Sequence, residues 1–316
     1  ALQGGPLGQT LEVEARKAAV ALFGRECVAW KEMLAEGEAV DLSFVCADQR
    51  VVRAHRLLLA GSSPMMRRVL KGPLGQVTTA LHVQSSPGQT QVTLMECRGW
   101  AVDRLVQFLY GGKLRVSGAA ELAELFSVSR HLDVAALQEA AEDGLLELLT
   151  VETCCDLLMI AEESGCSRVL EGCRRLVLEQ YGGVSRSGSW VNLAENEVEL
   201  VLKNERLVAV DEEQVLSGAM RWMSHGMKDR LANGRAALRG ERLAMHIRFA
   251  TMSTHQLQQL QQDPLIARSQ RIRAMVEQGL SVHRAGTAAQ PRQGLRNPAG
   301  ARAAVGPAMQ QQQQQQ

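Results

Sequence analysis

Cysteine and histidine are the side chains of this sequence whose types and spacing could do chemistry. Cys154, Cys155, Cys166 and Cys173 fall within 20 residues of one another, and cysteines at short paired spacing are typical of a zinc site. Neighbouring residues on a helix point about 100° apart, so Cys154 and Cys155 cannot easily hold one ion together. Cys173 also belongs to an apolar stripe. We therefore predict packed thiols and no metal site.

His55 stands in the run Ala54-His55-Arg56. A catalytic or metal-binding histidine needs partner groups, and the spacing places none beside it, so a hydrogen-bonded structural histidine is the prediction. The sequence contains no G-x-S-x-G elbow, P-loop, G-x-G-x-x-G turn or H-E-x-x-H helix. Carboxylates such as Glu139, Glu142 and Asp143 are expected on solvated helix faces. We therefore expect a protein that is not an enzyme and has no cofactor.

Composition favours a largely helical protein of two domains. The chain has 316 residues, enough for two domains of ordinary size. Apolar residues make up 46% and aromatic residues only 3%. The core must therefore consist mainly of Leu, Val, Ala and Met, which favours helices over an all-β sandwich.

Charge argues against nucleic acid as a partner. The net charge is +1. Seven arginines and one glutamate follow Asp263, a charge of +6, which leaves −5 for residues 1–263. The basic end contains no aromatic residue on which a base could stack. Nucleic-acid binding is therefore not expected.

Cysteine usage favours a reducing compartment. The chain has seven cysteines, an odd number, and no C-x-x-C pair. It shows no signal peptide and no apolar run of membrane length. We predict reduced, buried thiols in a cytoplasmic or nuclear protein, with no membrane partner.

The elements that must position these residues are short strands and helices in the first half of the chain. Apolar residues that recur at every second position predict a strand, and apolar residues three or four positions apart predict a helix. The first elements predicted in chain order are a loose or helical lead over residues 1–20, a helical pattern over Leu11–Glu38, a strand over Asp41–Cys46, a turn at Asp48-Gln49 and a strand at Val51-Val52. The elements predicted next are a helix to about residue 70, loop-forming residues over 71–90, a strand over Gln91–Leu94, a helix over Trp100–Tyr110 and two helices within Glu121–Leu149.

From Thr150 the pattern becomes helical throughout. Thr150 is a candidate N-cap, and Gly165 is a candidate helix end because glycine tolerates left-handed geometry. Asp211, followed three residues later by Gln214, fits a capping box. A short helix is predicted over 254–262. Residues 267–316 form a basic tail that ends in glutamines; it could continue as helix to about residue 279 and is otherwise expected to be disordered.

Several motifs carry a resemblance to known families. The run Asp41–Cys46, followed by Ala54-His55-Arg56 and Ser63-Pro64, resembles the opening of a BTB/POZ domain, and Phe108-Leu109-Tyr110-Gly111-Gly112 is similar to a later segment of that domain. The helical half resembles a BACK domain, the module that follows BTB in Kelch-like proteins. Three pieces carry this second likeness: Thr150–Cys173, Asp211–Met223 and Ile247–Ser253.

The resemblance implies a fold class and domain boundaries. We expect an α+β BTB/POZ fold, a small sheet flanked by helices, followed by an all-α BACK helical domain and a disordered tail. The BTB/POZ domain is placed at 21–149, the BACK domain at 150–266 and the tail at 267–316. No repeat of 40–50 residues follows the helical module in this sequence. The resemblance is thus to the Kelch-like type without Kelch repeats.

The family also implies a dimer. In BTB domains an Asp before the first strand and a basic residue after Ala-His form a charged pocket near the dimer interface, which corresponds to Asp41 and Arg56. The helix that bears Phe23 and Trp30 would pack against the partner subunit. Two interpretations stay open for the charges, because buried ions must meet each other or a partner. They either shape the interface, or neutralise one another and fix the fold.

A cullin is the second implied partner. The likeness places the cullin against residues 64–76, the corners Gly111–Val116 and Val128–Asp133, and the helices of Thr150–Leu178. The family commonly carries an apolar-x-Glu motif here, and this chain has Leu74-Gly75-Gln76. A neutral Gln loses a charge-assisted hydrogen bond of about 1.5–3 kcal/mol, or roughly tenfold or more in affinity. The predicted contact residues are Met65, Met66, Leu74, Gln76, Tyr110, His131 and Leu157.

The function implied is that of a non-catalytic dimeric substrate adaptor of a cullin-RING ubiquitin ligase. Its partners would be a second copy or a related BTB protein, a cullin scaffold and an unidentified substrate protein. A structural BTB scaffold that binds no cullin is the first alternative, and Gln76 favours it. A corepressor recruiter that uses Asp41 and Arg56 is the second, although zinc fingers usually accompany that role and no finger pattern occurs here.

Overall fold

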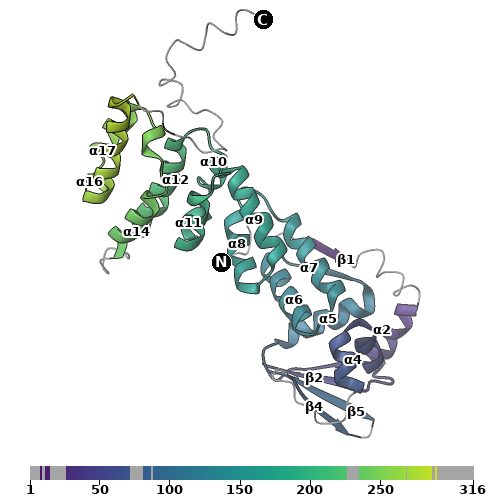
Figure 1. The fold of residues 1–316 in the computed structure, drawn as a ribbon. Helices are drawn as coiled ribbons and strands as arrows, with labels where there is room; N and C mark the ends of the chain where they lie inside the picture. Colours follow the sequence, from purple (N-terminus) through teal and green to yellow (C-terminus); the bar gives the residue numbers. More distant parts are fainter. Residues whose placement is uncertain are drawn as a thin grey trace, which may run out of the picture. The chain divides into compact units, whose positions relative to one another are not determined.

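The computed structural model describes residues 8, 11–14, 26–71, 81–86, 88–225, 235–267, 269–286 and 289. The chain divides into two compact units (Figure 1). The first unit comprises residues 1–149 together with 159–170, and the second comprises 150–158 together with 171–316. Two segments therefore belong to a different unit from their neighbours in sequence.

A four-stranded sheet lies in the first unit. Its strands are β2 (Leu42–Cys46), β3 (Val51–Ala54), β4 (Leu81–Ser86) and β5 (Gln89–Leu94), in the spatial order β3-β2-β5-β4. β2 runs parallel to β5 and antiparallel to β3, and β4 runs antiparallel to β5. Every second residue of β2 and β3 is buried, as expected for strands with one face on the core.

Helices complete this unit, and the predicted helices are confirmed here. α5 (Gly99–Gly111) packs on β2 and β3, and α6 (Ala119–His131) packs on α5 and on α7 (Ala135–Glu147). α3 (Arg56–Ser62) and α4 (Pro64–Lys71) connect β3 to β4 and contact each other. Fully buried side chains from these elements include Leu42, Phe44, Leu59, Val92, Val102, Leu105, Leu122, Leu125 and Leu137.

The predicted turn between the first two strands is confirmed and has a second role. Gln49 adopts a left-handed conformation with φ of 60°. The Asp48 carboxylate accepts hydrogen bonds from the backbone N–H of Arg50 at 3.3 Å and of Gly99 at 3.0 Å. Asp48 therefore ties the hairpin to the first residue of α5, where a negative charge also suits the helix dipole.

Two predictions for the first half were wrong. Leu11–Glu14 form strand β1, antiparallel to β6 (Lys113–Val116), where a helix or loose lead was expected. The helix, α2, begins only at Glu26 and ends at Glu36. Likewise, β4 lies within the segment predicted to be loop. β1 pairs with β6, which is distant in sequence, and β4 pairs with β5, which follows it after a turn. Such pairing overrides the local preference of the residues.

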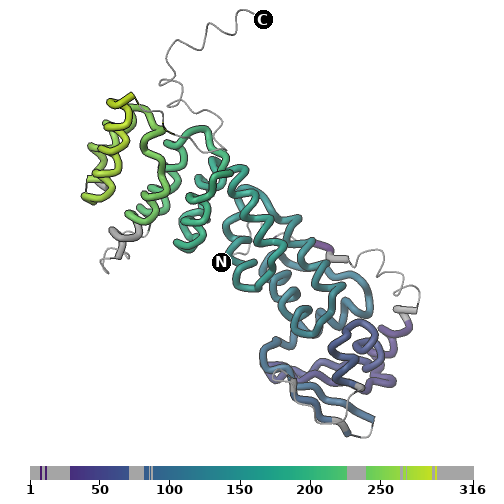
Figure 2. The backbone as a smooth tube through the Cα atoms, in the orientation of Figure 1, coloured from purple at the N-terminus to yellow at the C-terminus, as the bar shows by residue number. Residues whose placement is uncertain are grey.

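The second unit contains helices, as predicted. The residues of α8 (Cys154–Ser164) and α9 (Ser167–Glu179) are divided between the two units, and the later elements belong to the second. Figure 2 shows the path of the chain through these helices. The following elements are α10 (Tyr181–Val184), η2 (Ser189–Asn192), α11 (Glu195–Lys203), α12 (Glu212–Ser224), α14 (Arg235–Ala244), η3 (Phe249–Thr251), α15 (Thr254–Gln261), α16 (Pro264–Ala267) and α17 (Gln270–Arg284).

Helix ends in this half match the sequence in part. Gly165 has φ of 71° and ends α8, as predicted. Asp211 caps α12 by accepting from the Gln214 N–H at 2.9 Å, but the Gln214 side chain returns to the N–H of Val210 and so does not complete the capping box. Thr150 bonds with Thr153 in a turn before α8, so its predicted N-cap position was wrong.

The start predicted for the tail, residue 267, lies too early in the sequence. Ile272, Val276 and Leu280 of α17 are buried, and this helix packs on η3 and α15. Residues 270–284 therefore belong to the helical unit, while most of the chain after Gly286 lies outside the described residues. None of the helices that the structure describes is long and apolar enough to cross a membrane.

Candidate protein-interaction site

Asp41 and Arg56 lie close together, and their side chains bind the backbone. The Asp41 carboxylate accepts the backbone N–H of Arg56 at 2.8 Å, at the start of α3. The Arg56 guanidinium donates to the Leu70 carbonyl at 2.8 Å, near the end of α4. The two residues therefore fix α3 and α4 in place. Their charges do not meet in the direct ion pair that one interpretation expected, because each side chain binds a peptide group instead.

His55 is a structural histidine, as its motif predicted. It is 3% exposed, and its Nε2 lies 2.9 Å from the Glu38 carbonyl. An imidazole that donates there through Nε2 leaves Nδ1 as an acceptor, and Nδ1 lies 2.5 Å from the Tyr110 hydroxyl. The same hydroxyl accepts the backbone N–H of His55 at 3.0 Å. Trp30 packs edge-on against the imidazole, with ring centroids 5.1 Å apart.

The N-terminus of α4 is anchored to the corner between α6 and α7. Ser63 caps the helix by accepting the Met66 N–H at 2.9 Å and donates to the Leu132 carbonyl at 2.6 Å. Asp133, whose φ is 54°, accepts the Met65 N–H at 3.1 Å. Two of the segments predicted to contact a cullin are thus joined by hydrogen bonds into one rigid surface.

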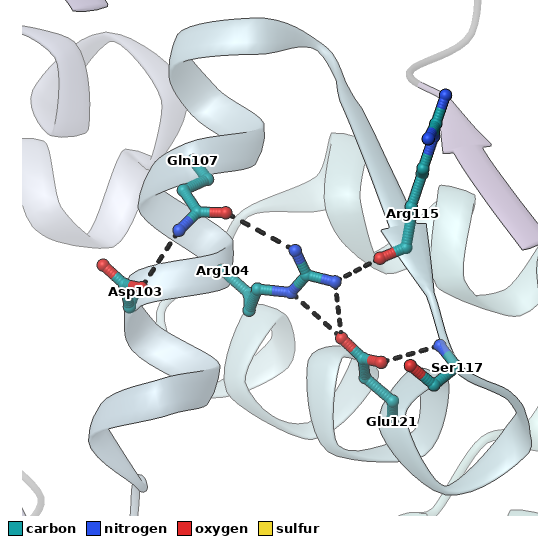
Figure 3. Close-up of polar contacts among 6 residues, drawn as sticks. All are labelled: Asp103, Arg104, Gln107, Arg115, Ser117 and Glu121. Atoms are coloured by element: carbon teal, nitrogen blue, oxygen red, sulfur yellow. Dashed lines mark hydrogen bonds and ion pairs between the residues drawn. The ribbon is translucent and has the colours of Figure 1, made fainter. Parts of the chain in front are cut away.

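A polar network holds the third predicted segment, the corner of residues 111–116, against α5 and α6 (Figure 3). The Arg104 guanidinium meets the Glu121 carboxylate through Nε at 3.0 Å and a terminal nitrogen at 2.8 Å, and it also donates to the Arg115 carbonyl. The second Glu121 oxygen accepts the Ser117 N–H at 2.7 Å. Arg104 and Glu121 are mostly buried, so this pair is screened less than a surface ion pair.

The structure places the predicted cullin-contact residues in three classes. Met66, Tyr110 and Leu157 are buried completely or almost completely, at 0%, 1% and 0% exposure. A side chain without exposed surface cannot touch a partner in this conformation, which corrects the assignment of these three to the contact set. Met65 and His131 are half-buried and remain accessible. Leu74 and Gln76 lie outside the described residues, as does Phe23 of the predicted dimer interface.

The structure adds one surface residue that sequence reasoning missed. Leu57 is 72% exposed on α3, although its neighbour Leu59 is fully buried. Three successive leucines on one helix of seven residues cannot all face the core, and this spacing was the available signal. Trp30, from the predicted interface helix, is half-buried.

The cysteines are buried, free thiols, as predicted for core packing. This holds for the six cysteines whose side chains the structure describes, which are Cys46, Cys97 and the four that drew attention in the sequence. The Cys154 thiol donates to the Cys173 carbonyl at 3.4 Å. Burial raises the pKa of the Cys155 thiol to about 12 and that of Cys97 to about 12. In the part of the chain that the structure describes, no three His, Cys, Asp or Glu residues gather as metal ligands would.

These thiols are expected to react slowly in the native protein. Because only the thiolate attacks a disulfide reagent, a pKa near 11 or above lowers the reactive fraction at least about a hundredfold relative to a free cysteine. With an aromatic disulfide reagent at pH 8, Cys46, Cys97, Cys154, Cys155 and Cys166 should react at least that much more slowly in native than in urea-unfolded protein. Rapid native release of several equivalents of reporter would contradict the buried arrangement.

Comparison with known proteins agrees with this architecture. A model of the BTB/POZ domain matches residues 30–149, and a model described as "BTB And C-terminal Kelch", the BACK domain, matches residues 154–262. The fold and both matches define the class: the chain is a BTB–BACK protein.

Its relatives are Kelch-like proteins. The chain is 26% identical to human (Homo sapiens) Kelch-like protein 17 over 203 residues, which is 64% of this chain and 30% of that protein. It is 24% identical to Kelch-like protein 38 of Danio rerio over 226 residues, or 72% of this chain and 36% of that protein. The chain therefore spans about a third of the length of these relatives.

Proposed function

We propose that this protein is a non-catalytic, dimeric substrate adaptor of a cullin-RING ubiquitin ligase, acting in the cytoplasm or nucleus. The observation that carries the proposal is the succession of a BTB domain and a BACK domain in a relative of the Kelch-like proteins. An adaptor needs no catalytic group of its own. It raises the effective concentration of a bound substrate near the enzyme that modifies it.

The dimer is assigned to the surface around α2 and α3. Leu57 exposes a large aliphatic side chain on this surface. The indole ring of Trp30 is half-buried and adds exposed aromatic area. Tryptophan is a typical anchor of protein interfaces, and burying an exposed leucine beside it would add apolar area to the contact. The backbone beneath them is held by the contacts of Asp41, His55 and Tyr110, so little ordering entropy is lost when a partner binds.

The cullin is assigned to the surface formed by the first turn of α4 and the corner between α6 and α7. Met65 and His131 are the accessible residues among the predicted contacts that the structure describes. The capping bonds of Ser63 and Asp133 make this surface rigid before any partner arrives. Gln76 in the acidic motif position weakens the expected affinity, as argued from the sequence.

Replacing Leu57 by Asp is expected to weaken the dimer at least tenfold. An exposed leucine buried at an interface contributes about 1.5–3 kcal/mol, and a buried carboxylate adds a desolvation cost. Light scattering on a sizing column measures the mass directly. Arg53→Ala, an exposed change on β3, is the matched control and should leave the mass unchanged. A Leu57→Asp protein with the mass and dissociation constant of the wild type would remove this surface from the dimer.

The cullin assignment is tested by isothermal titration with a cullin N-terminal domain. Binding should be measurable, Met65→Asp should weaken it, and Gln76→Glu should strengthen it about tenfold by adding a charge-assisted hydrogen bond. Arg53→Ala should bind like the wild type. If neither the wild type nor Gln76→Glu binds while the protein remains a dimer, the cullin role fails and the dimeric scaffold stands in its place. Gln76 is the observation that favours this second candidate.

A further inference from the structure

An apolar groove in the second unit lies between α17 and the segment 244–251, which includes η3. Its volume is about 560 Å³, a size typical of sites that hold a ligand. Met245 is 47% exposed, and Met275 and Val282 on α17 are half-buried in its walls. Flexible thioethers can adapt to irregular apolar occupants.

The floor of the groove is tightly closed. A Cβ atom on Gly279 would stand 3.1 Å from the Phe249 carbonyl carbon and 3.2 Å from its Cβ. α17 therefore lies directly on η3, with Phe249 only 4% exposed. The apolar surface left accessible belongs to the rim and walls, chiefly Met245, Met275 and Val282.

The chain itself returns to this groove after α17. The helix has its C-cap at Ala285, and Gly286 takes the left-handed conformation with φ of 66° that commonly reverses a chain there. Ala289, three residues later, is half-buried and forms part of the same groove wall. The described part of the chain therefore ends, at Ala289, in the wall of the groove.

We propose that residues 290–298 of the same molecule fill this groove, with Leu295 as the apolar anchor. Leu295 is the first large apolar residue after Val282. It stands six residues beyond Ala289, a reach of up to about 20 Å, which approaches the roughly 22 Å length of a 15-residue helix such as α17. Pro291 and Pro298 favour an extended backbone. The short tether gives an effective concentration on the order of millimolar, so one anchor is sufficient.

The test compares full-length protein with full-length Leu295→Ser, both labelled at methionine methyl groups for NMR. The Met245 and Met275 methyl signals should move in the variant, whereas Met159 of α8 should not. A chain that ends at Ala289 should show the same displacement, and a synthetic peptide of residues 287–300 should restore the original positions. Gln293→Ser, a polar change in the same segment, is the matched control and should leave both signals in place.

Two results would overturn the proposal. Identical Met245 and Met275 signals in the wild type, Leu295→Ser and the chain ending at Ala289 would show that the segment does not occupy the groove. Signals of the full-length protein that move toward those of Leu295→Ser on dilution would show that the occupant comes from a second copy. Dimerisation and cullin binding are proposed for residues of the first unit, and the comparison of the wild type with Leu295→Ser and with the chain ending at Ala289 tests neither of them.

Discussion

Replacing Tyr110 by Phe should lower the free energy of unfolding of the first unit by about 2–4 kcal/mol. The change removes one oxygen, yet that oxygen accepts the backbone N–H of His55 and meets its Nδ1. Both His55 atoms would stay buried without a partner, and each such loss costs about 1–3 kcal/mol. Burial raises the pKa of Tyr110 to about 12, so the hydroxyl remains a donor to Nδ1 throughout the neutral range.

This cost should depend on His55, and a double-mutant cycle separates it from general damage. In a His55→Ala background the imidazole Nδ1 is absent, and the Tyr110 hydroxyl keeps only the backbone N–H of residue 55 as its partner. Tyr110→Phe should therefore lower the free energy of unfolding by at least about 1 kcal/mol less in that background. Urea unfolding followed by the ¹⁹F signals of fluorotryptophan at Trp30 and Trp100 reports on the first unit. Equal costs in both backgrounds would show that the hydroxyl stabilises the unit by some other contact.

Local signals in the sequence were sufficient for the centre of the BTB fold. Alternation over Leu42–Cys46 with a polar turn at Asp48-Gln49 predicted the hairpin, and a stripe of apolar residues predicted α5. These elements could be predicted because the spacing of apolar residues and the residues of a turn are properties of a few adjacent positions. Strand β1 could not be found this way, since Leu-Glu-Val-Glu fits a helix or a strand and only pairing with β6 decides between them.

The candidate site was harder to predict, because its geometry depends on contacts across the chain. Asp133 was placed at a helix corner, but its bond to the Met65 N–H joins residues 68 apart in sequence. Tyr110 was assigned to a surface because the family motif carries it, and the motif does not show that its hydroxyl is turned inward onto His55. Which member of a leucine run is exposed, as Leu57 is, likewise follows from packing alone.

Replacing Trp190 by Ala should destabilise the second unit by about 3–5 kcal/mol, the usual cost of deleting a large buried aromatic ring. Trp190 is fully buried on η2, and its indole N–H donates to the Gly218 carbonyl of α12 at 2.9 Å. Tyr181 of α10 meets it edge-on at 5.6 Å and donates to the Val215 carbonyl at 2.9 Å. The Trp190 side chain thus joins η2, α10 and α12. Removing the ring leaves a cavity where these three elements pack against one another.

Two further variants separate the volume of Trp190 from its hydrogen bond. Trp190→Phe keeps a six-membered aromatic ring and loses the donor to Gly218 together with a small part of the ring volume, so it should cost about 1–3 kcal/mol, less than Ala. Val210→Ala, at a site 49% exposed, should change stability by less than about 0.5 kcal/mol. The fluorotryptophan signal of Trp222 follows unfolding of this unit. A Phe variant as unstable as Ala would mean that the Gly218 bond, and not the filled volume, holds η2 against α12.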